Sequence, residues 1–283
     1  MTEQKGQKLN QLQRLVPEGL LVDATWMQAH GYSRSLLSQY VASGWLEHPG
    51  RGIYRRPSGE LQWQHIVISL QSLLDIPVVV GGRSALELQG FAHYIPVSPS
   101  TQEVHLYSDK PLGEWTRKIR IDTRFEFHNA RRLFRESSIP SGGSNLNERT
   151  VAGVTNSNDV DHIGFIRQSW GQWNWPLTSS APERAILELL DQIPRKETFH
   201  QVDMMMEGLR TLRPNHLQIL LEDCHSVKVK RLFFWFAERH GFSWLTHIDK
   251  GPIDFGTGKR MVVPGGKLDK EYLITVPKDL YGV

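Results

Sequence analysis

Residues 31–56 read GYSRSLLSQYVASGWLEHPGRGIYRR, and this stretch decides the fold of the first part of the chain. Gly31-Tyr32-Ser33 reads as a tight turn, and its serine can cap a helix over 34–43. Before the turn, Asp23 can cap a shorter helix over 24–30. Two short helices joined by a three-residue turn are the pattern of a helix-turn-helix.

The end of the same stretch predicts a β-hairpin. The apolar pairs Trp45-Leu46 and Ile53-Tyr54 flank a tip rich in glycine and proline. Before the helix pair, a helical apolar pattern ends at Pro17, and a short apolar run follows it. This order predicts a winged helix-turn-helix domain over residues 1–57, with Pro57-Ser58-Gly59 as a linker. The expected core residues are Trp26, Leu37, Tyr40, Val41 and Trp45.

The second helix of the pair divides into an apolar face and a polar face without acidic residues. A helix that reads a major groove needs hydrogen-bonding groups that phosphate does not repel. Arginines beside a narrow glycine tip suit phosphate or a narrow minor groove. An alternative is a small module whose polar face meets only water or another protein. The residues expected to contact DNA are Ser33, Arg34, Ser35, Ser38 and Gln39 on the helix and Arg51, Tyr54, Arg55 and Arg56 on the hairpin.

Residues 61–283 predict a larger α+β domain, so the expected fold class is α+β with two domains. Apolar residues recur at helical spacing in some segments and alternate in others. The expected helices are 61–74, 83–90, 182–190, 197–211, 214–223 and 227–240, and the expected strands are 77–80, 103–107, 119–121, 125–127, 261–263 and 272–276. Residues 137–159 are rich in Pro, Gly, Ser and Asn and are expected to form a loop.

The composition limits the setting and the chemistry. The chain has 283 residues and a net charge of only +3, so only the distribution of its charges can favour a nucleic-acid partner. The single cysteine, Cys224, can form neither an internal disulfide nor a thiolate zinc site by itself. The polar N-terminus does not resemble a signal peptide, and no apolar run suits a membrane span. We therefore expect a cytoplasmic protein without a membrane partner.

One part of the second domain resembles a nucleotidyltransferase. Such enzymes bind triphosphate with a strand, a glycine-rich turn and a helix, and their next strand carries paired metal-binding carboxylates. Here the turn is Gly81-Gly82, but the next strand has Glu103 and then His105 in place of the second carboxylate. We therefore predict no enzyme, catalytic residue, metal or cofactor. The alternative function is a degenerate nucleotidyltransferase-like or nucleic-acid-processing protein that the helix-turn-helix targets.

Residues 110–135 contain eight basic and three acidic residues, interleaved with aromatic ones. This pattern can extend a nucleic-acid surface or meet RNA or an acidic partner, and the alternative is a solvated face of a sheet. The candidate residues for this surface are Lys110, Arg117, Lys118, Arg120, Arg124, Arg131 and Arg132.

Four motifs spread along the chain carry a family resemblance. They are LLVD (20–23) with the helix-turn-helix and its ending GRGIYRRP (50–57), VGGRSALELQG (80–90), TSSAPERAILELL (178–190) and VKRLFFWFAERHG (229–241). Together they resemble the AbiEi antitoxins of type IV abortive-infection toxin–antitoxin systems, which act in phage defence. The match is patchy but runs across most of the chain.

The resemblance implies a function and two partners. It implies a repressor that binds double-stranded operator DNA, with inverted repeats, in the promoter of its own operon. It also implies antitoxin action in the C-terminal region, here residues 61–283. The functional partner would be a nucleotidyltransferase-like toxin, without the need for a stable complex.

Overall fold

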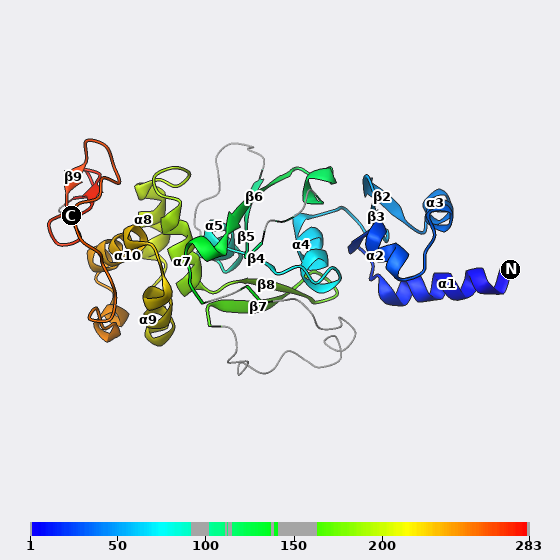
Figure 1. Ribbon diagram of the computed structural model, residues 1–283, viewed down its shortest axis with the longest axis horizontal. Coiled ribbons are helices and arrows are strands. Elements are labelled where there is room, and N and C mark those ends of the chain that lie inside the picture. The colour runs from blue at the N-terminus through cyan, green and yellow to red at the C-terminus, as the bar shows by residue number, and fades with distance from the viewer. Residues whose placement is uncertain are drawn as a thin grey trace.

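The fold class is α+β, as the sequence predicts. The computed structural model describes residues 2–91, 102–110, 112, 115–136, 139–140 and 163–281, with side chains from residue 7 onward. The molecule is elongated, with the N-terminal module at one end, a sheet in the middle and a group of helices at the other end (Figure 1). None of the described helices combines the length and the apolar character that a membrane span requires.

The N-terminal module is a winged helix-turn-helix. Asp23 caps the first helix of the pair by accepting from the Trp26 amide at 2.7 Å, and Ser33 caps the second through the Leu36 amide at 3.3 Å. The strands form an antiparallel sheet in the order β1-β3-β2, so the β2–β3 hairpin is the wing. The elements are α1 (Thr2–Leu15), β1 (Leu21–Asp23), α2 (Ala24–Ala29), α3 (Arg34–Ala42), β2 (Glu47–Gly50) and β3 (Ile53–Arg55).

The core of this module differs from the expected one at Trp45. Leu37 and Tyr40 of α3 are buried, together with side chains from α1 and α2. Trp45 is instead 43% exposed, because it lies in the turn from α3 to β2, where Leu46 supplies the buried side chain.

A five-stranded mixed sheet forms the centre of the molecule. Its strands are β4 (Val78–Val80), β5 (Gln102–Ser108), β6 (Thr123–Asn129), β7 (Phe165–Trp170) and β8 (Trp175–Ser180), in the order β6-β5-β4-β8-β7. β5 is antiparallel to β4 and parallel to β6, whereas β8 is parallel to β4 and antiparallel to β7. Packed on the sheet or joined to it are α4 (Trp63–Ser72), α5 (Gly82–Leu88) and two short 3-10 turns, η1 (Thr116–Lys118) and η2 (Ala130–Arg132).

Helices form the far end of the molecule, and a C-terminal segment with a small strand pair follows them. Pro182 begins α7 at a position where a missing N–H costs nothing, and Gly241 ends α10 with a left-handed backbone. Three phenylalanines of α10 are fully buried in this end of the core: Phe233, Phe234 and Phe236. The elements are α7 (Pro182–Asp191), α8 (Phe199–Glu207), α9 (Pro214–Asp223), α10 (Val227–His240), η3 (Ser243–His247), β9 (Lys267–Leu268) and β10 (Thr275–Val276).

Three sequence expectations differ from these elements. The β7–β8 hairpin is not among the expected strands, and β8 contains Pro176, a residue that strands usually avoid. Residues 119–121 and 261–263 are not strands. The first segment turns its backbone toward the wing, where the Arg120 amide donates to the Pro49 carbonyl at 3.4 Å. The loop expected over 137–159 lies largely outside the described residues.

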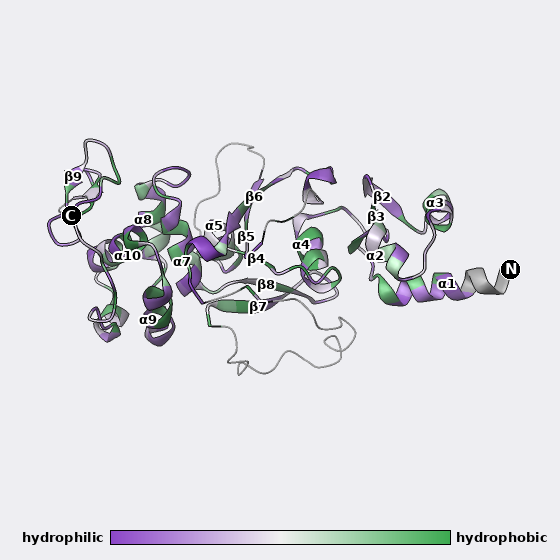
Figure 2. Ribbon diagram, viewed as in Figure 1, coloured by the Kyte–Doolittle hydropathy of each residue, from purple (hydrophilic) through white to green (hydrophobic). Residues whose placement is uncertain are grey.

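One hydrophobic cluster spans the expected boundary at residues 57–61. Leu20, Leu21 and Ile53 of the first unit pack with Trp63 and Ile66 of α4, and the cluster continues into the sheet. The Leu21 amide also donates to the Ser69 hydroxyl at 2.8 Å. Figure 2 shows the hydrophobic colour of α4, which lies between the N-terminal module and the sheet. The division into 1–57 and 61–283 stays a prediction, and the structure joins the two units through a shared core.

Candidate nucleic-acid interface

The polar face of α3 lies in solvent. Arg34, Ser35, Ser38 and Gln39 are all exposed, while Leu37 on the opposite face is fully buried. The Ser38 hydroxyl donates to the Arg34 carbonyl at 3.1 Å, which leaves its oxygen able to accept. The Ser33 hydroxyl is used as the cap of α3 and lies 3.0 Å from the Ser35 hydroxyl. The structure therefore brings the expected reading residues onto one accessible face.

The tip of the wing presents one arginine. Arg51 is exposed and has no hydrogen-bond or ion-pair partner in the described part of the chain. Its turn is closed by the Gly52 amide, which donates to the His48 imidazole at 3.2 Å. Tyr54 is half-buried with its ring 5.4 Å from that of His48, so it supports the hairpin.

Arg55 has an internal role in place of the expected DNA contact. The residue is 3% exposed, because its side chain crosses the base of the wing. Its guanidinium donates to Glu47 of β2 at 3.1 Å, to the Gly19 carbonyl at 3.3 Å and to the carbonyls of Ser58 and Gly59. Burial lowers the pKa of Arg55, and Glu47 opposes this shift. Arg55 therefore fastens β2, β3 and the following segment together.

Arg56 also turns inward. Its guanidinium donates to the Gln13 and Val16 carbonyls, both at 3.1 Å, and pairs with Glu18 at 3.0 Å. These carbonyls lie at and just beyond the C-terminal end of α1, where a cation is favourable. The sequence pattern of three clustered arginines does not reveal this, because the carbonyls that accept from Arg56 lie 40 and 43 positions earlier in the chain.

The segment around η1 lies against the wing. Three cations here are exposed: Arg117, Lys118 and Arg120. Their side chains make no hydrogen bond or ion pair with the described residues, whereas Ile119 between them is buried. The amide of Arg120 bonds to the Pro49 carbonyl of β2, as noted above. Figure 1 shows α3, the wing and η1 along one side of the molecule. Part of the predicted basic surface is thus adjacent to the helix-turn-helix.

The remaining residues of that surface lie elsewhere. Arg124 on β6 pairs with Glu103 at 3.6 Å and with Glu126 at 2.8 Å, so its charge is balanced locally. Because β5 and β6 are parallel, the residues just after both strands share the other end of the sheet. Three exposed candidates are placed there: Lys110, Arg131 and Arg132.

The turn at Gly81-Gly82 is filled by protein atoms. The Glu188 carboxylate of α7 accepts from the Gly82 amide at 2.8 Å. A Cβ at Gly81 would overlap both this carboxylate and the Tyr107 ring. The sequence therefore needs glycine here to admit Glu188 and Tyr107. The Glu188 carboxylate therefore occupies the space beside the Gly82 amide.

The strands after this turn hold a histidine pair in place of paired carboxylates. His105 of β5 and His128 of β6 approach with Nδ1 and Nε2 2.9 Å apart. Lys196 pairs with the neighbouring Glu126. No group of three or more His, Cys, Asp or Glu side chains in the described ranges could hold a metal ion. Cys224 is buried, and this burial raises its pKa to about 11, which keeps the thiol protonated.

Acid is expected to destabilise the protein through this pair. Burial, together with nearby positive charge, lowers the pKa of His105 and of His128 to about 4. Because the unfolded imidazoles protonate near pH 6.5, the unfolded state binds more protons below that pH. The free energy of unfolding should then fall from pH 6.5 toward pH 4, by at most about 1.4 kcal/mol per pH unit for each histidine.

Denaturant unfolding at a series of pH values measures this slope. A His105→Gln/His128→Asn variant should show a shallower dependence between pH 4 and 6.5. Equal slopes for the two proteins would assign the acid sensitivity to other groups. Arg83, Lys196 and Glu126 stay in both proteins, so their charges are common to the comparison.

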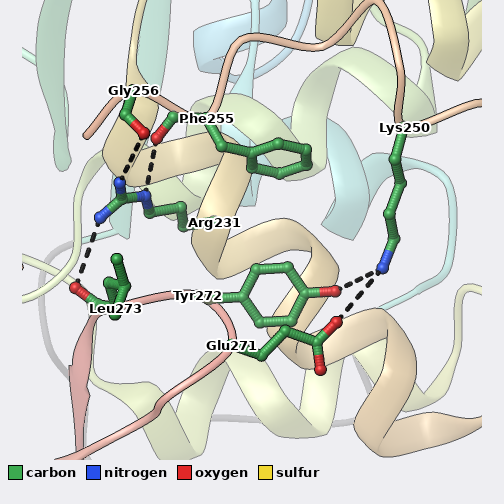
Figure 3. Close-up of a pocket in the computed structure, with 7 residues that line it drawn as sticks. All are labelled: Arg231, Lys250, Phe255, Gly256, Glu271, Tyr272 and Leu273. Atoms are coloured by element: carbon green, nitrogen blue, oxygen red, sulfur yellow. Dashed lines mark hydrogen bonds and ion pairs between the residues drawn. The ribbon is translucent and has the colours of Figure 1, made fainter. Parts of the chain in front are cut away.

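A small pocket lies at the helical end (Figure 3). It has a volume of about 240 Å³, and Arg231 of α10 borders it. Arg231 donates to the carbonyls of Phe255, Gly256 and Gly258, and Lys250 donates to the Tyr272 hydroxyl at 2.7 Å. Arg231 thus ties the C-terminal segment to α10, and Lys250 is bonded to Tyr272 of that segment.

The geometry defines a class of protein: a winged helix-turn-helix joined through a shared core to a mixed α/β domain with a helical end. Two family profiles match the chain. "Transcriptional regulator, AbiEi antitoxin N-terminal domain" matches residues 5–97, and "Transcriptional regulator, AbiEi antitoxin, Type IV TA system" matches residues 101–277. The chain belongs to the AbiEi antitoxin family of transcriptional regulators in type IV toxin–antitoxin systems. This confirms the resemblance that the motifs indicate.

A solved structure has a similar fold. It is the crystal structure of the RV2827C protein from Mycobacterium tuberculosis, with 14% sequence identity and a TM-score of 0.52 over 94% of this chain and 89% of that chain. At this identity the likeness concerns the fold alone. No curated protein matches the sequence.

Proposed function

We propose that this protein binds duplex DNA in a sequence-specific manner, with α3 in the major groove. The exposed, acid-free polar face of α3 is the observation that carries the proposal. Arg34 and Gln39 can make bidentate contacts to base edges, and Ser35 and Ser38 can donate or accept. The Ser33 cap fixes the first turn of the helix, from which a reading helix usually contacts bases.

The wing and the η1 segment supply the phosphate contacts in this proposal. Arg51, Arg117, Lys118 and Arg120 are exposed cations on two adjacent elements, and their charges are not compensated by described carboxylates. Such cations displace the counterions of DNA and make binding depend on salt. Arg55 and Arg56 are left out of this set, because their guanidinium groups are bonded within the module.

We further propose that the DNA is the operator of the protein's own operon and that the protein acts as an autorepressor and antitoxin. Membership of a family described as transcriptional regulators and antitoxins supports this. The toxin partner would be a nucleotidyltransferase-like enzyme, neutralised without a stable complex. An operator with inverted repeats would engage two copies of the winged module.

A non-enzymatic second domain is part of the proposal. The turn that would hold a triphosphate contains the Glu188 carboxylate, and His105 stands where a metal ligand is needed. Two hard oxygen ligands suit magnesium, and an imidazole does not replace one of them well. Magnesium-dependent nucleotide incorporation into RNA or protein that Glu103→Ala abolishes would contradict this part.

Arg51→Ala is expected to reduce the salt dependence of operator binding by about one phosphate contact, a change of about one unit in the slope of log K against log salt. Sequence preference should stay unchanged, because phosphate contacts carry no base information. Fluorescence anisotropy with the full chain and a duplex from its own promoter, at several salt concentrations, measures both quantities.

Arg131→Ala is the matched control for Arg51→Ala. It removes another exposed arginine, at the far end of the sheet, so its slope should equal that of the unmodified protein. If Arg51→Ala and Arg131→Ala lower the slope equally, the wing has no special role. If the unmodified protein shows no preference for any duplex from its promoter, the DNA-binding proposal itself is wrong.

A further inference from the structure

We propose that the η1 segment of the second domain positions the wing for DNA, so that operator affinity depends on the sheet of that domain. This inference rests on the proposed DNA binding and adds positioning residues to it. The residues concerned are Gly50 at the end of β2 and the segment Lys118-Ile119-Arg120, which precedes β6.

Gly50 shows how close the two elements are. A Cβ built on Gly50 would overlap the Lys118 carbonyl oxygen, which is a backbone atom and cannot rotate away. The backbone of Gly50 does not require glycine for its own conformation, since its φ is not in the left-handed region. The close approach alone therefore explains a glycine here. Next to it, the Arg120 amide donates to the Pro49 carbonyl at 3.4 Å.

Ile119 anchors the other side of this contact. It is 7% exposed and belongs to the same hydrophobic cluster as Ile53, the first residue of β3. The cluster also contains Val104 and Leu106 of β5. Ile119 thus shares one buried cluster with residues of the sheet and of the wing, and its backbone neighbours Lys118 and Arg120 contact β2.

This contact holds the wing at its β2 side, which is the edge of the module's sheet. Within the module, the wing is held on its β3 side by the β1–β3 pairing and by the Ala24 amide, which donates to the Gly52 carbonyl at 2.8 Å, and at its base by the Arg55–Glu47 pair. Gly50 lies at the tip, beside Arg51. Cations on the wing and on η1 can contact one DNA backbone together only while this contact fixes their separation. A ligand or partner that displaces the β5–β6 connection would therefore weaken operator binding.

Gly50→Ala in the full chain tests the proposal. Its Cβ should push the wing away from η1 and weaken operator binding about tenfold, the effect of losing one charge-assisted contact. The salt slope should fall by about one unit. In an Arg51→Ala background, Gly50→Ala should weaken binding by no more than about twofold, because the contact that it disturbs is already missing.

Ile119→Ala is the second variant, because it leaves the wing sequence intact. It should lower the operator affinity and the salt slope. As with Gly50→Ala, the loss should be much smaller in an Arg51→Ala background. Ile121→Ala is its control, since Ile121 packs on the same cluster but lies outside the segment 118–120, whose backbone contacts β2. Both variants should unfold at a lower temperature than the unmodified protein. If only Ile119→Ala also binds the operator more weakly, the result supports a role of Ile119 in positioning the wing.

Three results would overturn the inference. The first is an unchanged affinity and slope in Gly50→Ala. The second is an equal loss in the presence and absence of Arg51, and the third is an equal loss of binding in Ile119→Ala and Ile121→Ala. A lack of operator binding by the unmodified chain is a different result, which removes the proposed function as well.

Discussion

Glu188→Ala is expected to lower the free energy of unfolding by about 3–5 kcal/mol, the range for removing one partner of a buried ion pair. Glu188 and Arg184 of α7 are both fully buried and pair at 2.8 Å. The Arg184 guanidinium lies between the Phe134 and Phe165 rings, at 4.1 and 4.4 Å from their centres. Without Glu188, the buried Arg184 guanidinium loses this ion pair, and the Gly82 amide loses its acceptor.

Glu183→Ala is the matched control for Glu188→Ala. Glu183 is equally buried on the same helix, but its partner Arg213 has a side chain that is 48% exposed, so water can solvate it after the change. Its cost should be smaller, about 1–3 kcal/mol. An Arg184→Met/Glu188→Leu variant should regain part of the loss, because an apolar pair can replace a buried ion pair. Equal costs for Glu188→Ala and Glu183→Ala in guanidinium titrations would contradict this account.

Arg34→Ala/Gln39→Ala is expected to weaken operator binding by about 2–6 kcal/mol, since each good base contact contributes about 1–3 kcal/mol. Both side chains are exposed on α3, so the free energy of unfolding should hardly change. The variant should also lose preference for the operator over an unrelated duplex, which competition binding measures. Unchanged affinity and preference would show that α3 is not the reading helix.

A matched control for this variant comes from α1. Gln13→Ala/Arg14→Ala removes the same two residue types from exposed positions outside the helix pair. Its operator binding should stay close to that of the unmodified protein. The α3 variant should still rescue growth when the toxin is expressed, if repression and antitoxin action reside in different parts of the chain. A loss of rescue together with a loss of operator binding would contradict that separation.

The helix-turn-helix could be predicted from the sequence because its signals are local. Asp23 and Ser33 mark where α2 and α3 begin, and the glycines that follow mark where they end. Each of these signals lies next to the helix end that it determines. The periodicity of α3 then determines which side chains can be buried and which meet solvent. Outside this module, the family motifs indicate the family by resemblance, and the family profiles confirm that resemblance.

The contacts of the arginines could not be predicted in this way. Arg51, Arg55 and Arg56 are neighbours in sequence, yet Arg55 and Arg56 are bonded inside the module and Arg51 is free of described partners. Alternation along a strand would send the neighbours Arg55 and Arg56 to opposite faces. Both turn inward because distant segments bring acceptors to them: the Gly19 carbonyl to Arg55, and the Gln13 and Val16 carbonyls to Arg56.

The sequence by itself determined the class of the N-terminal module, the polar face of α3 and the absence of paired carboxylates after Gly81-Gly82. The tertiary structure decided what fills the glycine turn and what supports the wing. Glu188 reaches Gly82 across 106 positions, and Lys118 reaches Gly50 from beyond β5. Such contacts leave no local periodicity or capping signal, because they arise only when the packing of a common core brings distant segments together.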